Sequence, residues 1–289
     1  MRDLFIQNLT NQAKINKKIV LVVGDLGFGV VETFKEKFPK RFYNAGVAEQ
    51  SMMGIATGLA MEGFHVFVYS IANFPTFRCA EQIRNDVDYH KSSITIVSVG
   101  SGVGYGNLGY SHHGIQDFAL MRSFPNMLIA SPSDETELIG CLNYLYKNPQ
   151  PSYLRLDKSL KNKNSNKVPV IKPGKWIFYK KINNKNIVIS TGATAHNCNN
   201  LLKTYSNYDW CTIPMWGMKS KLLQAKKLAK YKNVITVENH LQDGGFGSWL
   251  NESLLINKNK INIISKFFNN KVIGVVGSED YLNSRFGPK

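Results

Sequence analysis

The sequence has few cysteines, few acidic residues and no long apolar run. Its longest apolar segments, "IVLVV" at 19–23 and "ITIVSV" at 94–99, have the length of strands and fall far short of the roughly 20 residues that cross a bilayer. The first segment, "MRDLFIQNLTNQAKINKK", contains no continuous apolar stretch of the kind that marks a secretory signal. We therefore expect no membrane-spanning segment, no membrane partner and a cytoplasmic location.

The four cysteines are Cys79, Cys141, Cys198 and Cys211, and they are widely and irregularly spaced. This spacing matches neither a zinc-ligand pattern nor a redox pair, and it suits a reducing compartment. We interpret the cysteines as structural and expect no metal site built by this chain.

Acidic residues are outnumbered by basic ones, 20 to 36, which gives a formal net charge of +16. A charge of this size fits nucleic acid, an anionic membrane, phosphorylated substrates or an acidic protein partner. The lysines, however, are mixed with asparagines, as in "KINNKN" and "LKNKNSNK", which is typical of solvated surface. Because no arginine-rich run or basic stripe with interleaved aromatics is present, we expect no nucleic-acid partner.

A chain of 289 residues with 43% hydrophobic residues is long enough for two domains with cores of their own. Short β-branched runs alternate with segments of helix length, which predicts an α/β fold with parallel sheets covered on both faces. In the first half the expected strands are 19–23, 65–69, 94–99 and 127–130, and the expected helices are 48–62, 76–90 and 133–147.

The segment "SLKNKNSNKVPVIKPGKW" at 159–176 interrupts this alternation with Lys, Asn, Pro and Gly, as a linker does. The alternation then restarts, with strands expected at 186–191, 233–239 and 271–277 and helices at 194–205 and 245–256. We therefore predict two parallel-sheet α/β domains, at 1–160 and 176–289, joined by a linker at 161–175.

One carboxylate, Glu49, stands at the head of the small-residue apolar helix expected at 48–62. The small residues of this helix allow close packing, so the helix is expected to be buried. The helix dipole favours an acidic residue in the first turn, which would explain a solvated Glu49 without any function. A buried carboxylate would instead have a raised pKa and could hydrogen-bond a ligand.

A glycine-rich loop follows the expected strand 94–99, in "GSGVGYGNLGYSHHGIQDFALMRSFPN" at 100–126. Its five glycines between Gly100 and Gly109 would let a ligand approach the backbone. Adjacent histidines such as His112 and His113 rarely bind one metal, because neighbouring side chains diverge. A histidine on such a loop could move protons near neutral pH, although a structural role is equally open.

Taken together, these segments resemble a known family. The first half resembles the pyrimidine-binding domain of transketolases and 1-deoxyxylulose-5-phosphate synthases, and the second half is similar to their C-terminal domain. The matching segments are "GDLG" (24–27), "AGVAEQSMMGIATGLAMEG" (45–63), "AEQIRND" (80–86), "GYSHHGIQDFALMRSFPNMLIASPSDETE" (109–137), "PSYLRLDK" (151–158), "STGATA" (190–195), "TVENHLQDGGFGSWL" (236–250) and "VGSEDYLNSRFG" (276–287).

The resemblance implies a thiamine diphosphate cofactor and assigns residues to its pyrimidine end. Glu49 matches the glutamate that hydrogen-bonds the pyrimidine nitrogen and favours the imino tautomer of the ring, and would be catalytic. Asp25 matches an acidic residue close to the cofactor, and Phe74 with Phe77 falls where aromatic side chains pack around the pyrimidine. Ile71 stands where the family has a further aromatic residue.

The resemblance also assigns residues to the substrate. His112 matches the histidine that touches substrate and handles protons at the carbonyl, and would be the second catalytic residue. Lys158 takes the place of a phosphate-binding arginine, and Arg2 matches another arginine near the N-terminus.

Three positions depart from the transketolases that act on pentose phosphates. Leu108 stands where they have an aspartate that reads a donor hydroxyl, and Gly29 and Gly100 replace a serine and a histidine that contact phosphate. Each lost charge-assisted hydrogen bond is worth about 1.5 to 3 kcal/mol. The departures therefore predict a roomier, less polar pocket and a different or larger substrate.

The segments of a diphosphate-binding domain, which would hold magnesium, are absent from the sequence. The chain therefore resembles the C-terminal subunit of a split transketolase. This resemblance implies a separate N-terminal diphosphate-binding subunit that supplies the Mg2+ ligands, most simply in an α2β2 heterotetramer with active sites at the interfaces. We expect the chain to be inactive alone.

The function implied is transfer of a two-carbon ketol unit from a ketose donor to an aldehyde or aldose acceptor, including an unusual sugar. One alternative is a decarboxylating subunit that uses pyruvate or another 2-oxoacid, like 1-deoxyxylulose-5-phosphate synthase or the β-subunit of a 2-oxoacid dehydrogenase. A second alternative is a non-catalytic regulatory subunit, against which the presence of Glu49 and His112 argues.

Overall fold

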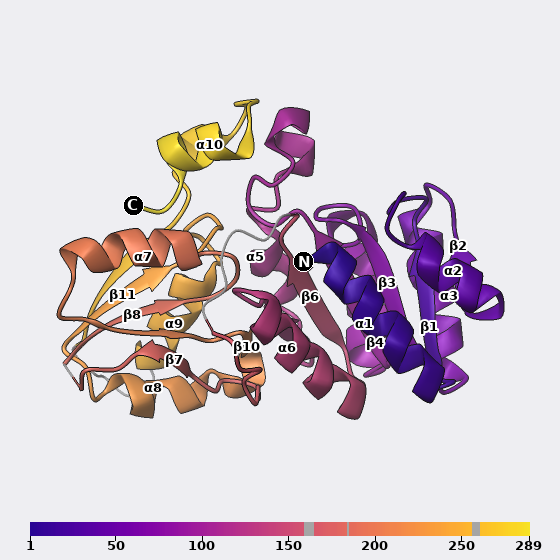
Figure 1. Cartoon of the computed structure of the whole chain (residues 1–289), viewed down its shortest axis with the longest axis horizontal. Coiled ribbons are helices and arrows are strands. Elements are labelled where there is room, and N and C mark those ends of the chain that lie inside the picture. Colours follow the sequence, from indigo (N-terminus) through magenta and orange to yellow (C-terminus); the bar gives the residue numbers. More distant parts are fainter. Residues whose placement is uncertain (159–164, 184, 256–260) are drawn as a thin grey trace.

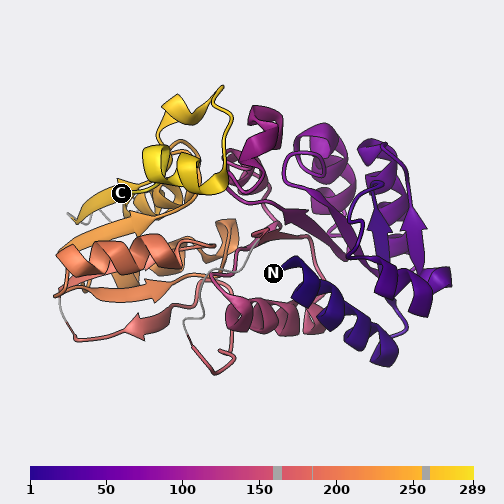
Figure 2. The same ribbon diagram turned by 45° about the horizontal axis from the view of Figure 1, so that its top comes forward.

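Figure 1 shows a computed structural model of the protein, which describes residues 1–158, 165–183, 185–255 and 261–289. In these ranges the chain forms two mainly parallel sheets that lie side by side, each covered by helices (Figures 1 and 2). This architecture confirms the predicted fold class, α/β with two parallel-sheet units. No helix in the described ranges is long and apolar enough to cross a membrane.

The first sheet has seven strands and is parallel except at one edge. In spatial order its strands are β10 (Met215–Trp216), β5 (Leu128–Ala130), β6 (Ser152–Leu156), β4 (Ile94–Val99), β3 (His65–Ile71), β1 (Ile19–Val23) and β2 (Phe42–Asn44). The central strands are buried almost throughout, because both faces of these β-branched and aromatic runs are covered. Since β1 to β6 are parallel, their carboxyl ends meet at one edge of the sheet.

Helices cover both faces of this sheet. One face carries α1 (Arg2–Ile15), α2 (Glu32–Lys37) and α6 (Glu135–Lys147), and the other carries α3 (Glu49–Met61), α4 (Ala80–Gln82) and α5 (Asp117–Met121). The helix expected at 76–90 is irregular: a 3₁₀ turn, Phe77–Cys79, leads into α4, which widens into a π-helix at Ile83–Tyr89.

The second sheet has five strands, parallel except for one edge strand. In spatial order they are β12 (Asn262–Lys266), β11 (Asn233–Val237), β8 (Asn186–Ser190), β9 (Asp209–Thr212) and β7 (Ile177–Lys180). Three helices pack on this sheet, α7 (Ala195–Thr204), α8 (Leu222–Leu228) and α9 (Phe246–Leu255), and α10 (Glu279–Phe286) lies near the glycine-rich loop of the first half (Figure 1).

The prediction of a strand at 271–277 is wrong. This segment forms a 3₁₀ turn, Asn270–Val272, followed by a loop in which Gly274 has a φ of 82°. Val272 is buried in a small cluster against the glycine-rich loop, whereas the edge of the sheet is already occupied by β12. Val272 is therefore buried between the two halves of the chain, whereas Ile273 and Val276 of the same run are 45% and 61% exposed, and the segment does not extend the sheet.

The two halves share a core, which limits their independence. Phe118 of α5 packs edge-to-face on Trp216 of β10, with ring centres 5.0 Å apart, and Trp216 also contacts Phe246 and Trp249 of α9. Strand β10 comes from the second half yet pairs with β5 of the first sheet. The predicted boundaries at 160 and 176 stay predictions: of the proposed linker, 161–164 lies outside the described residues, and 165–175 contains no helix or strand.

Candidate active site at the carboxyl edge of the first sheet

The residues proposed for the site follow successive strand ends of the first sheet. Asp25 follows β1, Glu49 follows β2, Phe74 follows β3, His112 follows β4 and Lys158 follows β6. Parallel strands end at the same edge, so the topology gathers these positions although they are far apart in the sequence. Ligands of open α/β sheets bind at such an edge.

Glu49 is the first residue of α3 and is only 4% exposed. The helix that follows buries Met52, Met53 and Ala56, which holds its first turn against the sheet. Glu49 Oε1 accepts a hydrogen bond from Arg78 Nη1 at 2.9 Å, while the Arg78 side chain remains 46% exposed. A buried carboxylate thus meets one cation at the border with solvent.

Arg78 connects Glu49 to an aromatic group. Its guanidinium carbon lies 4.0 Å from the centre of the Phe74 ring, a cation–π contact. The next residue, Cys79, donates from its thiol to the backbone oxygen of Glu49 at 3.3 Å. Burial, helped by the charge of Glu49, raises the pKa of Cys79 to about 12, so this thiol acts as a structural donor.

His112 also contacts Phe74. The two rings are edge-to-face with centres 5.1 Å apart, and His112 Nδ1 lies 2.9 Å from Ser111 Oγ. Partial burial, and then the charge of Arg78, lower the pKa of His112 below its ordinary value. The imidazole is therefore neutral at neutral pH and can both accept and donate a proton.

Tyr105 links His112 to the two predicted phosphate ligands. Its ring centre is 6.4 Å from that of His112, and Lys158 Nζ lies over the ring at 4.8 Å. Arg2 approaches the Tyr105 hydroxyl and opposes, by charge and hydrogen bonding, the burial that raises the pKa of this phenol. Six residues thus form a continuous strip of contacts: Glu49, Arg78, Phe74, His112, Tyr105 and Lys158, with Arg2 at the side of Tyr105.

Other predicted residues lie at the margin of this strip. Asp25 has a φ of 54° and accepts a hydrogen bond from Asn44 Nδ2 at 2.9 Å, so the ends of β1 and β2 are tied together. Phe77 is 46% exposed, and Ile71 receives the backbone hydrogen bond from Phe74 that forms the turn after β3. Leu108 is 56% exposed on the glycine-rich loop. No described contact joins Phe77, Leu108 or Asp25 to Glu49, and their roles remain predictions.

The two adjacent histidines occupy different environments. His113 is 1% exposed, and its ring nitrogens have no hydrogen-bond partner among the described residues. Its backbone oxygen accepts a hydrogen bond from Asn73 at 2.9 Å. Burial lowers the pKa of His113, so it too is neutral at neutral pH. Within the described part of the chain no three His, Cys, Asp or Glu residues gather as metal ligands.

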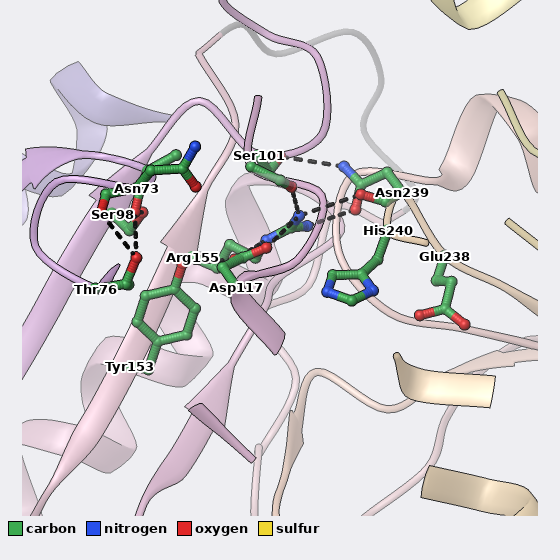
Figure 3. Close-up of polar contacts among 12 residues, drawn as sticks. Asn73, Thr76, Ser98, Ser101, Asp117, Tyr153, Arg155, Glu238, Asn239 and His240 are labelled. Atoms are coloured by element: carbon green, nitrogen blue, oxygen red, sulfur yellow. Dashed lines mark hydrogen bonds and ion pairs between the residues drawn. The ribbon is translucent and has the colours of Figure 1, made fainter. Parts of the chain in front are cut away.

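A second polar network holds the base of the glycine-rich loop (Figure 3). Arg155 of β6 donates from Nε to Asp117 at 2.6 Å, from Nη1 to Asn239 Oδ1 at 2.5 Å, and to the backbone oxygen of Gly114. Gly114 is itself paired with Gly102. Asn239 lies in the second half of the chain, so this network fixes the loop against both domains.

Two members of the strip were not predicted from the sequence. Arg78 stands two residues before "AEQIRND" and looks like one of many surface cations, and Tyr105 is an aromatic residue within a glycine-rich loop. The signal that could have revealed Tyr105 is its position between Gly104 and Gly106, where a large ring must pack on something. The signal for Arg78 is its distance of four residues from Phe74.

The fold and the site define a class, an α/β protein whose candidate site lies at the carboxyl edge of its first sheet. Residues 1–163 match the family "Transketolase, pyrimidine binding domain". The chain is 30% identical over 275 residues to one of the subunits of the apulose-4-phosphate transketolase of Phocaeicola vulgatus, covering 91% of this chain and 86% of that one. It therefore belongs to the transketolase family.

Two further comparisons fit the same family. The 1-deoxy-D-xylulose-5-phosphate synthase of Halothermothrix orenii is 27% identical over 284 residues, and the alignment spans 90% of this chain but 41% of that longer protein. A solved structure described as "Split gene transketolase, inactive beta4 tetramer" superposes with a TM-score of 0.85 at 26% identity, over 100% of this chain and 93% of that one. The chain thus corresponds to the C-terminal subunit of a split transketolase, which confirms the prediction.

Proposed function

We propose that the protein is the pyrimidine-binding subunit of a thiamine-diphosphate-dependent transketolase, which transfers a two-carbon ketol unit between sugars. The observation that carries the proposal is the buried carboxylate of Glu49, joined through Arg78 to Phe74 and the neutral His112, at the carboxyl edge of a transketolase-family sheet. A solvated first-turn carboxylate, the alternative interpretation of Glu49, does not fit its 4% exposure.

The residues present fit the pyrimidine end of the cofactor. An aminopyrimidine offers a ring nitrogen for a carboxylate and an apolar face for an aromatic ring, and Glu49 and Phe74 supply these two groups on either side of Arg78. When bound, the cofactor supplies the carbanion chemistry that side chains lack. Glu49 would hold the pyrimidine nitrogen, and Phe74 would border the ring, with Phe77 and Ile71 near it in the sequence and Asp25 at the end of the neighbouring strand β1.

His112 is the proposed proton donor and acceptor for the substrate. Its lowered pKa keeps the ring neutral, so Nε2 can take a proton while Nδ1 stays with Ser111. The imidazole is partly exposed, which leaves it open to a bound sugar. At acidic pH the ring would carry a proton and this role would be lost.

We also propose a separate diphosphate-binding subunit, with which this chain assembles as α2β2. The similar solved structure is described as an inactive tetramer of β chains, which agrees with a β chain that needs a partner. The acidic clusters needed to hold a magnesium ion are missing from the described residues, so we propose that the partner provides the ligands. The net charge of +16 would favour an acidic partner.

The substrate is proposed to be an anionic sugar that differs from ordinary pentose phosphates. Leu108 in place of a hydroxyl-reading aspartate supports a changed donor end, and the cations Arg2 and Lys158 support an anionic group. Two relatives bear a name that includes apulose 4-phosphate, which is a phosphorylated sugar.

A decarboxylating activity is the second candidate, supported by the relatives named 1-deoxy-D-xylulose-5-phosphate synthase. The two candidates differ in one product: carbon dioxide is released from pyruvate only by the decarboxylating enzyme. Carbon dioxide release by the assembled protein, with no ketol transfer from ketoses, would replace the transketolase assignment by this one.

The test of the proposed function compares Glu49→Gln with Glu62→Gln, a matched change at the exposed end of the same helix α3. Loss of the carboxylate should reduce ketol transfer by the assembled enzyme about 100- to 1,000-fold, in the range seen for deleted electrostatic groups. The Glu62→Gln control should retain activity. Equal activity of wild type and Glu49→Gln would instead favour a non-catalytic subunit.

A further inference from the structure

The space beside Gly100 is filled by the ring of Tyr105. Gly100 has a φ of 94°, and a Cβ atom at this residue would overlap ring carbons Cδ2 and Cε2 of Tyr105. A side chain at residue 100 and the observed position of Tyr105 are therefore mutually exclusive. At the position where the resemblance places a histidine in pentose-phosphate transketolases, this chain has Gly100, and the phenol ring of Tyr105 from the glycine-rich loop fills the space beside it.

Tyr105 interacts with both cations that border the site, with Lys158 through its ring and with Arg2 through its hydroxyl. Lys158 Nζ lies 4.8 Å from the ring centre, and Arg2 approaches the hydroxyl. The Arg2 Nε atom is also 3.7 Å from Asp3, whose side chain is 70% exposed, so this pair is weak and does not by itself fix the position of Arg2. Without Tyr105, the side chains of Arg2 and Lys158 would lose the one residue with which both interact among the contacts described above.

Resting on the proposed function, we infer that Tyr105 is a positioning residue, which sets Arg2 and Lys158 side by side to bind the phosphate ester of the sugar substrate. Its hydroxyl takes over the hydrogen bond that a histidine at residue 100 would have made. Partial burial keeps the phenol protonated at neutral pH, so the hydroxyl can donate to a phosphate oxygen. His112, 6.4 Å from Tyr105 between ring centres, then stands at the carbonyl end of the same substrate.

The test measures binding and not turnover, so that it does not depend on the proposed reaction. The full chain is titrated by calorimetry with ribose 5-phosphate and, separately, with ribose, a probe pair that differs only in the phosphate. The variants are Tyr105→Phe, which removes the hydroxyl, and Tyr105→Leu, which also removes the ring. Tyr110→Phe is the control, because Tyr110 lies on the same loop and its hydroxyl donates to Gln116 on the exposed surface.

Tyr105→Phe should weaken ribose 5-phosphate binding about fivefold, the effect of one hydrogen bond, and Tyr105→Leu about tenfold or more. The affinity for ribose should be unchanged in both Tyr105 variants. In Tyr110→Phe the affinities for ribose 5-phosphate and for ribose should both equal those of the wild type. Wild-type affinity in both Tyr105 variants, or equal losses for ribose and its phosphate, would overturn the inference. Circular dichroism checks that each variant is folded. If Tyr105→Leu is not folded, Tyr105→Phe still tests the inference.

The two proposals can fail separately. If the assembled protein performs no ketol transfer but the phosphate-specific loss is observed, the proposed function is wrong and the positioning role stands. If ketol transfer proceeds with wild-type KM for phosphorylated sugars in Tyr105→Phe and Tyr105→Leu, the positioning role is wrong and the proposed function stands.

Discussion

The molecule contains two arginine–carboxylate pairs of the same construction in opposite settings. In each, the arginine lies on a phenylalanine ring: Arg155 on Phe118 at 4.3 Å and Arg78 on Phe74 at 4.0 Å. The side chains of Arg155 and Asp117 are 1% and 0% exposed, whereas Arg78 is 46% exposed and its partner Glu49 is 4% exposed. The difference in exposure separates a structural pair from a candidate site.

The closed pair is completely satisfied (Figure 3). Asp117 also accepts a hydrogen bond from Tyr153 at 2.6 Å, and Arg155 reaches the side chain and backbone oxygens of Asn239. Both side chains of this pair are buried and hydrogen-bonded within the protein, so the pair is closed to a ligand, and its partners come from both halves of the chain. It fixes the base of the glycine-rich loop.

The open pair keeps unused capacity. Among the described residues one hydrogen bond joins Arg78 to Glu49, and the Arg78 side chain is 46% exposed, so guanidinium donors remain accessible to a ligand. A charged pair that is half open can exchange its partner for a ligand without leaving a buried charge alone. The comparison therefore predicts that variants of the closed pair change stability and variants of the open pair change function.

Breaking the closed pair should have the largest effect. Arg155→Met leaves the buried Asp117 charge uncompensated, which is expected to reduce the free energy of unfolding by about 3 to 5 kcal/mol. Denaturant titration followed by fluorescence measures this loss. Arg122→Met is the comparison: its pair with Glu252 is partly exposed, and the loss should be about 1 kcal/mol. Similar losses in both variants would mean that burial does not distinguish the pairs.

The closed region should also respond to acid through His240, which is stacked on Phe118 with ring centres 5.2 Å apart. Burial lowers the pKa of His240 to about 4, with nearby Asp117 and Arg155 acting in opposite directions. Between about pH 6.5 and 4 the unfolded chain therefore binds a proton that the folded chain does not, and stability falls as the pH falls. The expected slope is about 1.4 kcal/mol per pH unit.

The measurement is the unfolding free energy against pH for wild type, His240→Gln and the exposed control His90→Gln. Subtracting the curve of a variant from that of the wild type cancels the contributions of other titrating groups. One of these is Glu238, whose pKa burial raises to about 7, so that its contribution to stability falls as the pH rises. The wild-type slope should flatten in His240→Gln only. A slope equal in all three proteins would remove His240 from the closed network.

The sequence predicted the fold because its regular elements carry local signals. Strands such as 19–23 and 94–99 are continuous apolar runs. The helix expected at 48–62 forms as α3, but the expectation that it is buried holds for one face only, because Gly54, Ile55 and Gly58 are exposed. The prediction of a strand at 271–277 failed because an apolar run does not show whether a segment pairs with a sheet: only Val272 is buried here, and Ile273 and Val276 are exposed. Here a turn at Asn270–Val272 packs on the glycine-rich loop, a contact between distant segments.

Site residues that belong to family motifs were predicted from the sequence, and site residues defined only by their contacts in the structure were missed. Glu49 and His112 belong to family motifs, whereas Arg78 and Tyr105 become visible only when the strand ends are brought together. The buried Arg155 was missed for the same reason, since its partner Asn239 lies 84 residues away. Pairings across such distances are set by topology, which a local pattern does not contain.

A smaller effect is expected from adding a methyl group at two glycines, Gly100 in a crowded position and Gly29 in an open one. Gly100→Ala would place a methyl group in the ring of Tyr105 at a positive φ, at an expected cost of about 2 to 3 kcal/mol. Gly29→Ala has a similar φ of 74° with nothing within 4 Å of the added carbon, so backbone strain alone should cost about 1 kcal/mol. Thermal unfolding measures the stability loss of each variant. In the Tyr105→Ala background, Gly100→Ala should cost no more than Gly29→Ala, because the clash with the ring is gone.

The smallest expected change is the one that separates the open pair most clearly. Arg78→Met should lower the free energy of unfolding by less than Arg155→Met does, because the arginine is half exposed although its partner Glu49 is buried. Its charge, however, is one cause of the lowered pKa of His112, so removing it should raise that pKa and move the acid limit of activity toward neutral pH. Arg78→Lys keeps the charge and should keep the pKa of His112. An NMR titration of the His112 ring measures this without turnover, and a downward shift in Arg78→Met, or equal behaviour of the Lys and Met variants, would contradict an electrostatic link between the two side chains.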